Sequence, residues 1–326
     1  MALTEEGIIH VPGMLSRWVR LGNGETAHYM TSGETGPAVI LLHGGIPGSS
    51  GTAGWRFMAP FLGANGFRVY CPDQPGFGLS DNREQYHPVN GVLDHVDFVN
   101  RFADAICVDK FSLAGNSMGC ISTAHYVVRY PHRVNYFALI AGFIGDHYIT
   151  EIEQELRVPV KQTTDSTQMS DMMNGIIRNQ AAITPDLIAM RTAAAERNAQ
   201  AWEKWHQANN FGRITGDVAR ALSTKGRIDK LDVPGIYMYG MNDVILPHDP
   251  IGYEQEDVLP KVQFFYVEDC GHQGQTDQPE IFNRVFLEFF RDGRVSRETA
   301  DLAGVSKRRP ELADLVEQSA TAPAAV

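Results

Sequence analysis

The feature that most constrains the fold of this chain is a repeated alternation of short apolar runs with longer stretches of helical spacing. Runs of this kind are typical of strands covered on both faces, and six of them occur, at 38–42, 67–72, 111–114, 136–140, 235–239 and 262–267. Helical periodicity lies between or after them, at 91–106, 117–130 and 280–291. The alternation predicts an α/β fold with a mostly parallel sheet flanked by helices.

A hairpin precedes this pattern, and one long segment interrupts it. Segments 16–21 and 25–32 flank a Gly-Asn-Gly turn, which predicts two antiparallel strands. Between about 145 and 225 one helical pattern follows another, as expected of an inserted helical cap. After the last long helix we expect one or two short helices and a disordered end of eight residues. The predicted division is a core of 1–144 and 226–295, a cap of 145–225 and a partly disordered C-terminal extension of 296–326.

Charge and cysteine content indicate which molecules this protein can bind and in which cellular compartment it works. With 28 basic against 39 acidic residues the formal net charge is −11, which repels nucleic acid and anionic lipid surfaces. Four scattered cysteines do not form the close pairs of a disulfide framework, so a reducing cytoplasm is expected. The start of the chain lacks the pattern of a secretory signal, and no run of about 18 apolar residues occurs. We therefore expect a cytoplasmic protein that binds a small molecule, and neither nucleic acid nor a membrane.

A serine lies between two glycines where a buried strand is expected to turn into a helix. The motif is GNSMG at 115–119. In a nucleophile elbow the serine occupies a strained turn, and the flanking glycines remove side chains that would collide with the neighbouring strand and helix. A small packing residue is the alternative. The strand-to-helix context favours Ser117 as a nucleophile.

A serine hydroxyl needs a base within hydrogen-bond reach and a carboxylate that orients the base. Asp243 follows the strand at 235–239, and His272 follows the strand at 262–267. Both fall at the carboxyl ends of strands, where open α/β sheets collect their active sites. The alternative for the histidine is a polar side chain on a solvent-exposed loop, and the alternative for the aspartate is a hydrogen-bonding role in a turn. Asp146 is the rival acid.

A glycine-rich run, HGGIPG at 43–48, follows the first parallel strand. Such a loop can aim bare backbone N–H groups at a developing oxyanion, together with the N–H of the residue after the nucleophile. We assign this role to Gly45 and Met118, with Gly44 beside them. A phosphate-binding loop is the alternative, but the lysine and Ser/Thr of a P-loop are absent.

Together these motifs make the chain resemble an α/β-hydrolase over about 38–291. More narrowly, it resembles the meta-cleavage product hydrolases, which cleave carbon–carbon bonds in aromatic and steroid degradation. The segments that carry the resemblance are 43–48, 54–55, 73–81, 115–119, 240–243, 270–272 and 282–284. The resemblance implies a vinylogous 1,5-diketone substrate that bears a carboxylate, and no metal or organic cofactor.

The resemblance also implies which side chains contact the substrate. Asn116 takes part in catalysis in that family, and Arg191 stands where a cap arginine holds the substrate carboxylate. A solvated helix face is the alternative for Arg191. The family pattern is broken at four places near the expected path of the substrate, namely at Ile46, Phe57, 141–144 and Gln273. The substrate-contact candidates are therefore Asn116, Arg191, Ile46, Trp55, Phe57, Phe143, Ile176 and Gln273.

The sequence is compatible with three functions. Carbon–carbon bond cleavage requires a conjugated electron sink in the substrate, and Asn116 and Arg191 favour it. Ester or lactone hydrolysis by the same triad needs neither residue, and the four departures favour this alternative. A ligand-binding protein that lost turnover is the third, which the intact Ser, His and Asp set disfavours. The C-terminal extension leaves pairing with a second subunit open.

Overall fold

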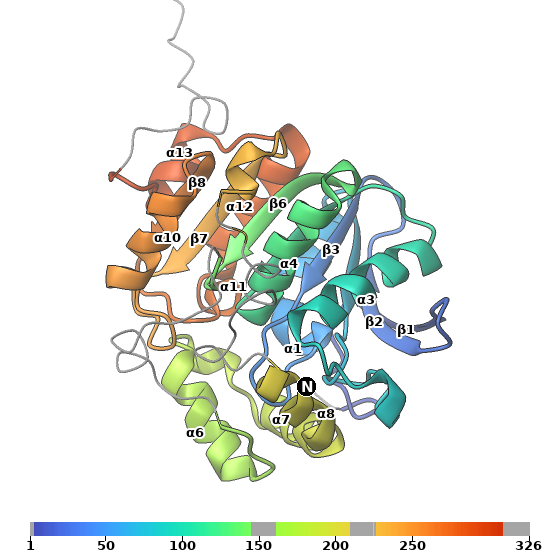
Figure 1. Cartoon of the computed structure of the whole chain (residues 1–326). Helices are drawn as coiled ribbons and strands as arrows, with labels where there is room; N and C mark the ends of the chain where they lie inside the picture. The colour runs from blue at the N-terminus through green and yellow to red at the C-terminus, as the bar shows by residue number, and fades with distance from the viewer. Residues whose placement is uncertain (1–2, 145–160, 209–223, 225, 309–326) are drawn as a thin grey trace, which may run out of the picture.

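The computed structural model describes residues 3–144, 161–208, 224 and 226–308. Within these residues one eight-stranded sheet has the order β1-β2-β4-β3-β5-β6-β7-β8 (Figure 1). β1 and β2 form an antiparallel hairpin, and the strands from β3 to β8 run parallel to one another. The strands are β1 (Leu15–Arg20), β2 (Thr26–Ser32), β3 (Ala38–Leu42), β4 (Arg68–Pro72), β5 (Phe111–Asn116), β6 (Val134–Ile140), β7 (Gly235–Gly240) and β8 (Val262–Val267). The predicted α/β fold is confirmed.

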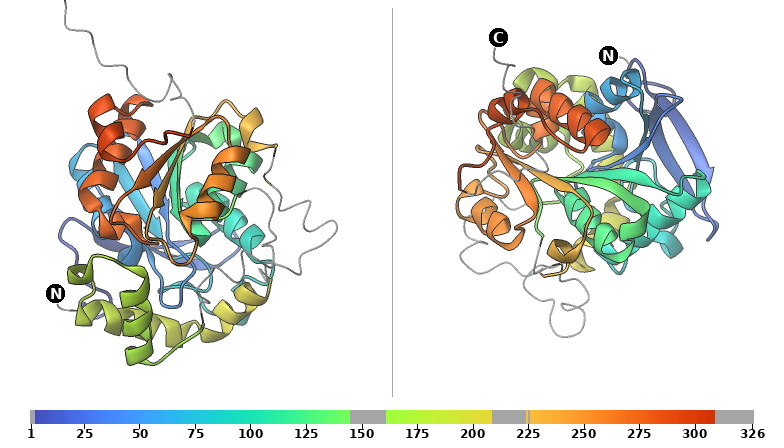
Figure 2. Two further views of the ribbon diagram at one scale, coloured as in Figure 1. Left: turned by 90° about the vertical axis from the view of Figure 1, so that its left-hand side faces the viewer. Right: turned by 90° about the horizontal axis from the view of Figure 1, so that it is seen from above.

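The central strands are apolar on both faces because helices cover both faces of the sheet (Figure 2). Successive side chains of a strand point to opposite faces, so β3 contributes Ile40 and Leu42 to one hydrophobic core and Val39 and Leu41 to the other. The helices that cover the sheet on the side of the first core are α3 (Val92–Ala105), α4 (Met118–Arg129) and α10 (Tyr253–Val258). Those on the side of the second core are α1 (Gly51–Trp55), α2 (Met58–Ala64), α12 (Pro279–Asp292) and α13 (Arg297–Leu302), and the short helix α11 (Gly274–Asp277) precedes α12.

Local sequence explains where the long helices begin and end. Helix α12 has Pro279 at its first position, where the missing N–H costs no helical bond. The helix ends at Gly293, whose φ of 68° is the left-handed conformation that closes many helices. Between these ends α12 buries the phenylalanines of one face against the sheet, namely Phe282, Phe286, Phe289 and Phe290.

Three helices lie beyond one end of the sheet and outside its two helical layers (Figures 1 and 2). They are α6 (Ser166–Ile176), α7 (Pro185–Arg197) and α8 (Ala199–Ala208). Asp165 caps α6 through the backbone N–H of Gln168, and Thr184 caps α7 through the N–H of Leu187. These helices fall inside the range predicted for the cap. Short 3₁₀ or π turns complete the chain at η1 (Glu84–Tyr86), η2 (Pro131–Arg133), η3 (Gln180–Ala182), η4 (Ile228–Lys230) and η5 (His248–Gly252).

The C-terminal extension packs against the core over its described part. After α13, the backbone of Gly304 accepts a hydrogen bond from Tyr266 at 2.8 Å, and Ser306 donates to Phe264 at 2.9 Å, so the extension covers the edge of β8. The predicted disordered end, 319–326, lies outside the described residues. Within the described part of the extension, the guanidinium of Arg308 lies 3.1 Å from the buried carboxylate of Glu256.

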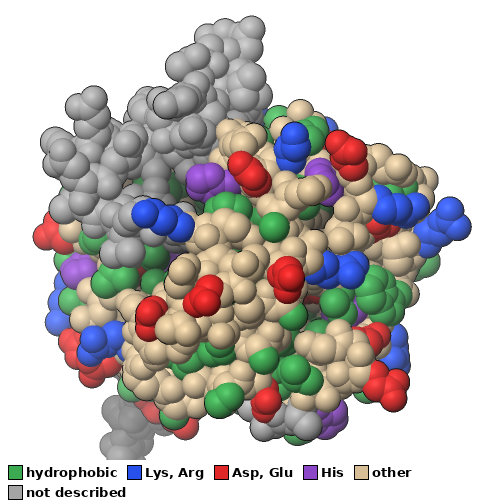
Figure 3. Space-filling view, turned by 90° about the horizontal axis from the view of Figure 1, so that it is seen from below, with side chains coloured by type: hydrophobic (Ala, Val, Ile, Leu, Met, Phe, Trp, Pro, Cys, Tyr) green, Lys and Arg blue, Asp and Glu red, His purple; other side chains and the backbone are tan. Residues whose placement is uncertain are grey.

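Surface charge is scattered on the face that contains the three outer helices. Acidic and basic side chains stand singly there, and no continuous basic stripe crosses the residues that are drawn in colour (Figure 3). A search of the described helices finds none that combines the length and the apolar character needed to cross a bilayer.

Candidate active site

Ser117 stands in the turn between β5 and α4, with φ 56° and ψ −116°. Positive φ is strained for a residue with a side chain, and such strain is concentrated at functional sites. Two glycines make the turn possible. A Cβ on Gly115 would collide with the carbonyl of Gly119, and a Cβ on Gly119 would collide with the carbonyl of Leu42. The predicted strand, turn and helix around Ser117 are present.

Asp243 and His272 are brought together because β7 and β8 are neighbouring parallel strands, and each residue lies in the loop after its strand. The Nδ1 atom of His272 lies 2.8 Å from Oδ2 of Asp243, and both residues are buried. The other carboxylate oxygen accepts the N–H groups of Ile245 at 2.8 Å and Leu246 at 2.9 Å. The carboxylate is therefore held toward the imidazole. Nε2 of His272 has no hydrogen-bond partner among the described residues. The rival acid, Asp146, lies outside the described residues.

Asn116 connects the strand of Ser117 to the loop of His272. Its side-chain amide donates to the carbonyl oxygen of His272 at 3.0 Å and to that of Ile140 at 3.4 Å. On the other side of the loop, the N–H of His272 donates to the carbonyl of Ile176 at the end of α6. The His272 loop is thus held by a hydrogen bond from the sheet on one side and by a hydrogen bond to the outer helices on the other.

The carboxylate of Asp277, which is not among the candidates from the sequence, holds the same loop. Asp277 accepts the N–H of Gly271 at 2.7 Å, of Arg178 at 2.9 Å and of Asn179 at 3.1 Å. Burial raises the pKa of Asp277, although these N–H groups oppose the shift. An acid five residues after the candidate base was the only local signal for it. Asp277 joins the His272 loop to the segment that follows α6.

The glycine-rich loop after β3 lies against the nucleophile elbow. A Cβ on Gly44 would be 3.3 Å from Cβ of Ser117, and a Cβ on Gly45 would be 3.1 Å from Cβ of Met118. Met118 is the first residue of α4, so its N–H has no partner within the helix. The structure therefore brings the predicted donors, Gly45 and Met118, to one place beside Ser117, with Gly44 next to them.

Two hydrogen bonds orient the peptides on either side of Gly45. Nδ1 of His43 lies 2.8 Å from the carbonyl oxygen of Gly44, and Nε1 of Trp202 donates to the carbonyl of Gly45 at 2.9 Å. Nε2 of His43 accepts the N–H of Gln74 at 3.0 Å, so its proton is on Nδ1. Burial lowers the pKa of His43, and the charge of Arg191 lowers it further, which keeps this imidazole neutral.

Arg191 is buried, with 2% of its surface exposed, although it carries a guanidinium. It donates to Oγ of Ser49 at 3.4 Å, and its Nε has no partner among the described residues. Burial and the charge of Arg56 lower the pKa of Arg191 to about 9. Arg56 is a second buried guanidinium, held by the carbonyls of Ala53 and Ala182, and burial lowers its pKa to about 10. Within the described chain neither arginine has an ion-pair partner, so this region presents uncompensated positive charge.

The remaining substrate-contact candidates are dispersed. Ile46, Phe143 and Ile176 are buried in the core on the α4 side of the sheet, whereas Trp55 is fully buried in the opposite core. Phe57 is half-buried beneath the guanidinium of Arg56, and Gln273 is buried at the start of α11. Trp55 therefore lies in a different core from Ile46, Phe143 and Ile176.

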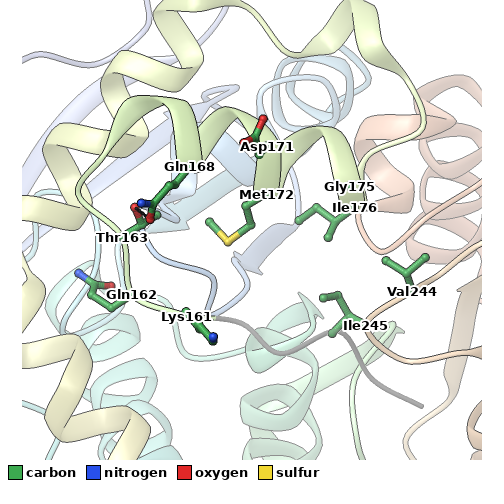
Figure 4. A pocket seen from close by; sticks show the side chains of 10 residues that line it. All are labelled: Lys161, Gln162, Thr163, Gln168, Asp171, Met172, Gly175, Ile176, Val244 and Ile245. Atoms are coloured by element: carbon green, nitrogen blue, oxygen red, sulfur yellow. Dashed lines mark hydrogen bonds between the residues drawn. The ribbon is translucent and has the colours of Figure 1, made fainter. Parts of the chain in front are cut away.

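A cavity of about 380 Å³ lies between α6 and the loop that carries Asp243. Met172 and Ile176 of α6 face Val244 and Ile245 across it (Figure 4). Polar residues line the rest of its wall, among them Lys161, Thr163, Gln168 and Asp171. Ile176 and Ile245 both bond through their backbones to the His272 and Asp243 pair, so the cavity adjoins the candidate site. No cluster of three metal-ligating side chains is found among the described residues.

Comparisons with known proteins agree with this architecture. Residues 37–279 match the family described as alpha/beta hydrolase fold. The chain is 30% identical over 266 residues to the 2-hydroxy-6-oxo-6-phenylhexa-2,4-dienoate hydrolase of Burkholderia cepacia, a match covering 79% of this chain and 89% of that protein. It is 29% identical over 276 residues to a 2-hydroxy-6-oxononadienedioate/2-hydroxy-6-oxononatrienedioate hydrolase of Comamonas testosteroni, covering 82% and 91%.

A solved structure extends the likeness to three dimensions. The 2-hydroxy-6-oxo-6-phenylhexa-2,4-dienoate hydrolase from Rhodococcus sp. strain RHA1 aligns with a TM-score of 0.70 and 21% identity, over 85% of this chain and 99% of that chain. The matched segment contains the elbow serine, the histidine and aspartate pair and the glycine-rich loop. On the family match and the shared fold, this chain belongs to the α/β-hydrolase family.

Proposed function

We propose that this protein is a serine hydrolase that cleaves a carbon–carbon bond in a meta-cleavage product, a vinylogous 1,5-diketone that bears a carboxylate. The observation that carries the proposal is the buried guanidinium of Arg191, which has no ion-pair partner among the described residues and lies beside the glycine-rich loop. A substrate carboxylate would supply the missing countercharge. The names of the relatives support it, because dienoates and dienedioates are carboxylates of this kind.

In this proposal Ser117 is the nucleophile or activates a water, His272 is the general base and acid, and Asp243 orients His272. The 2.8 Å contact between His272 and Asp243 supports these roles, because it holds a proton on Nδ1 and leaves Nε2 to accept one. The N–H groups of Gly45 and Met118 hold the oxyanion. Because they are backbone donors in a packed loop, they need no reorganisation as charge develops.

The reaction proceeds in two stages. After the dienol of the substrate ketonises, the oxygen of Ser117 or of water bonds to the remote carbonyl carbon, and its proton passes to His272. Collapse of the tetrahedral species breaks the carbon–carbon bond, and the electron pair enters the conjugated carbonyl system. His272 returns its proton to the dienolate. Where an acyl-enzyme has formed, water then releases the carboxylic acid, so that one water is added across the bond.

The cavity beside α6 supports an apolar group at the other end of the substrate. Its wall carries Met172, Ile176, Val244 and Ile245, close to the His272 and Asp243 pair. An aromatic or alkyl substituent on the remote carbonyl would be buried there, which is favourable in proportion to the apolar area removed from water. The proposed cellular setting is the cytoplasm, since all four cysteines are free thiols and three are buried.

Two substrates separate this proposal from ester hydrolysis. Purified protein is mixed with 2-hydroxy-6-oxo-6-phenylhexa-2,4-dienoate and, separately, with p-nitrophenyl acetate. Loss of the yellow dienone absorbance, with formation of benzoate, is the expected result, and Ser117→Ala should abolish it. Turnover of the ester with no effect on the dienone would show a carboxylesterase instead. Absence of both reactions, with no labelling of Ser117 by a fluorophosphonate, would show a binding protein.

A further inference from the structure

Helix α8, in the predicted cap, contacts the glycine-rich loop directly. Nε1 of Trp202 donates to the carbonyl oxygen of Gly45 at 2.9 Å, and this bond is buried and joins residues 157 positions apart. Trp202 is 5% exposed. A buried indole N–H usually finds a partner, but the partner here is the backbone of the residue whose own N–H is the candidate oxyanion donor.

Two hydrogen bonds restrain the backbone on the two sides of Gly45, and the first of them holds the peptide that contains the Gly45 N–H. The peptide between Gly44 and Gly45 is trans, so its N–H points away from its carbonyl, which is fixed by Nδ1 of His43. The next peptide is fixed by Trp202. Glycine has no side chain to limit rotation about its own bonds, so these two anchors replace the missing constraint. Without the bond from Trp202, one side of Gly45 is held by packing alone.

Side chains of α8 and α4 also pack against the glycine-rich loop at Gly45. A Cβ on Gly45 would be 2.6 Å from the ring of Trp205 and 3.1 Å from Cβ of Met118, so the loop is enclosed between α8 and the start of α4. Trp205 is 7% exposed and contacts Phe77, with ring centroids 5.5 Å apart. Phe77, Met118, Trp202 and Trp205 form a hydrophobic cluster of their own, distinct from the two cores of the sheet.

We propose that Trp202 is a positioning residue through which α8 sets the geometry of the oxyanion hole. The inference rests on the proposed hydrolytic function. The packing of α8 against the glycine-rich loop is then coupled to the stabilisation of the oxyanion. The reason is that the indole of Trp202 both holds α8 against the loop and donates to the Gly45 carbonyl. The cap therefore contributes to the rate of the chemical step and not only to the choice of substrate.

The test compares Trp202→Phe with Trp18→Phe. Each substitution removes an indole that donates one hydrogen bond, since Nε1 of Trp18 donates to Glu6 at 3.2 Å, but Trp18 is half-exposed on the edge strand β1. Misdirecting one of two oxyanion donors should lower kcat for the dienone and for p-nitrophenyl acetate roughly 10- to 100-fold in Trp202→Phe, with KM within about twofold. Trp18→Phe should keep the kcat of the wild type.

A boronic acid gives a readout that a purely structural role would not change. The oxygen of Ser117 bonds to boron, its proton passes to His272, and the tetrahedral anion places an oxygen at the oxyanion position. Phenylboronic acid should bind Trp202→Phe more weakly, by about the factor lost in kcat. Equal kcat and equal boronate affinity in Trp202→Phe and the wild type would overturn the inference.

The outcomes also separate this inference from the proposed function. If the wild type cleaves neither substrate but binds the boronate at Ser117, the boronate comparison still decides the role of Trp202. If the wild type binds no boronate and cleaves nothing, both proposals are wrong. Should Trp202→Phe not fold, benzothienylalanine at position 202 keeps the shape of the indole and lacks the N–H, and the same comparison applies.

Discussion

The side-chain amide of Asn116 donates to the carbonyl oxygen of His272 at 3.0 Å. One hydrogen bond therefore joins the residue before the candidate nucleophile to the candidate base, across 156 positions of sequence. The same amide also reaches the carbonyl of Ile140, the residue that faces Asn116 on the neighbouring strand. The distance between the elbow and the His272 loop is thus controlled from within the sheet.

Replacing Asn116 by alanine should slow catalysis because the His272 loop loses its tie to β5. A buried carbonyl left without its donor costs about 1–3 kcal/mol, so kcat for the dienone is expected to fall roughly 10- to 100-fold. Steady-state kinetics on the dienone measure this. Asn283→Ala is the matched control, because it removes an amide that donates to the carbonyl of Phe57 at 3.3 Å. Equal kcat in both variants would contradict the prediction.

Asp243→Asn should leave the fold intact and remove most of the activity. One amide oxygen can still accept the N–H groups of Ile245 and Leu246, but the amide nitrogen then faces Nδ1 of His272 and favours the wrong tautomer. A loss of roughly 10⁴-fold in kcat is expected, with circular dichroism unchanged. Fluorophosphonate labelling of Ser117 should slow in parallel. Labelling at the rate of the wild type would show that Asp243 is not the orienting acid.

Arg191→Met should have opposite effects on binding and stability. KM for the carboxylate-bearing dienone is expected to rise roughly 10- to 100-fold, while kinetics on p-nitrophenyl acetate stay the same, because only the dienone carries a countercharge. The variant should be more stable to denaturant by about 1–3 kcal/mol, because a buried cation without an ion-pair partner among the described residues is removed.

The matched control for Arg191→Met is Arg129→Met. Arg129 is exposed and lies 2.8 Å from Asp97. Its removal should therefore change neither the KM for the dienone nor the stability to denaturant appreciably. A higher KM together with lower stability would assign Arg191 a structural role in α7 instead of a role in binding.

Acid should destabilise the folded chain through His95. Burial lowers the pKa of His95 to about 3, from an ordinary value of 6.5. Between these values the unfolded chain binds a proton that the folded chain does not, so the free energy of unfolding decreases as the pH falls through this window. The contribution of His95 amounts to about 2 kcal/mol lost between pH 7 and pH 5.

Denaturant titrations at several pH values test this contribution. His95→Gln keeps a donor for the carbonyl of Pro75, to which Nε2 of His95 is bonded, but does not titrate. The free energy of unfolding of this variant should therefore depend less steeply on pH, because its unfolding takes up about one proton fewer. His10→Gln, at an exposed position, should keep the pH dependence of the wild type. Parallel curves for His95→Gln and the wild type would show that other groups control the response.

Local sequence was sufficient to predict most of the fold and to place the candidate site residues at the ends of strands. The six apolar runs became the six parallel strands, and the predicted helix at 91–106 is α3, Val92–Ala105. Ser117, Asp243 and His272 were found because each follows a strand, and strands in a parallel sheet end at the same edge. The strand before Ser117 was placed at 111–114 and extends to Asn116, since glycine and asparagine weaken its apolar pattern.

Other features depend on contacts between segments that are distant in sequence. Asp277 joins the His272 loop to the segment at 178–179, and that segment comes close to it only in the folded chain. The hydrogen bond from Trp202 to the carbonyl of Gly45 has no local signature in the sequence. Arg56 was not identified, because nothing in the neighbouring sequence distinguishes a buried arginine from an exposed one.

The sequence by itself determined the alternation of strands and helices and the position of the candidate site residues after strands, because burial pattern and turn chemistry are local properties of the chain. Only the tertiary structure decided which backbone groups those side chains engage and which charges lie without a partner among the described residues. Hydrogen bonds act over about 3 Å, and the residues that come within that distance are determined by the packing of the whole chain.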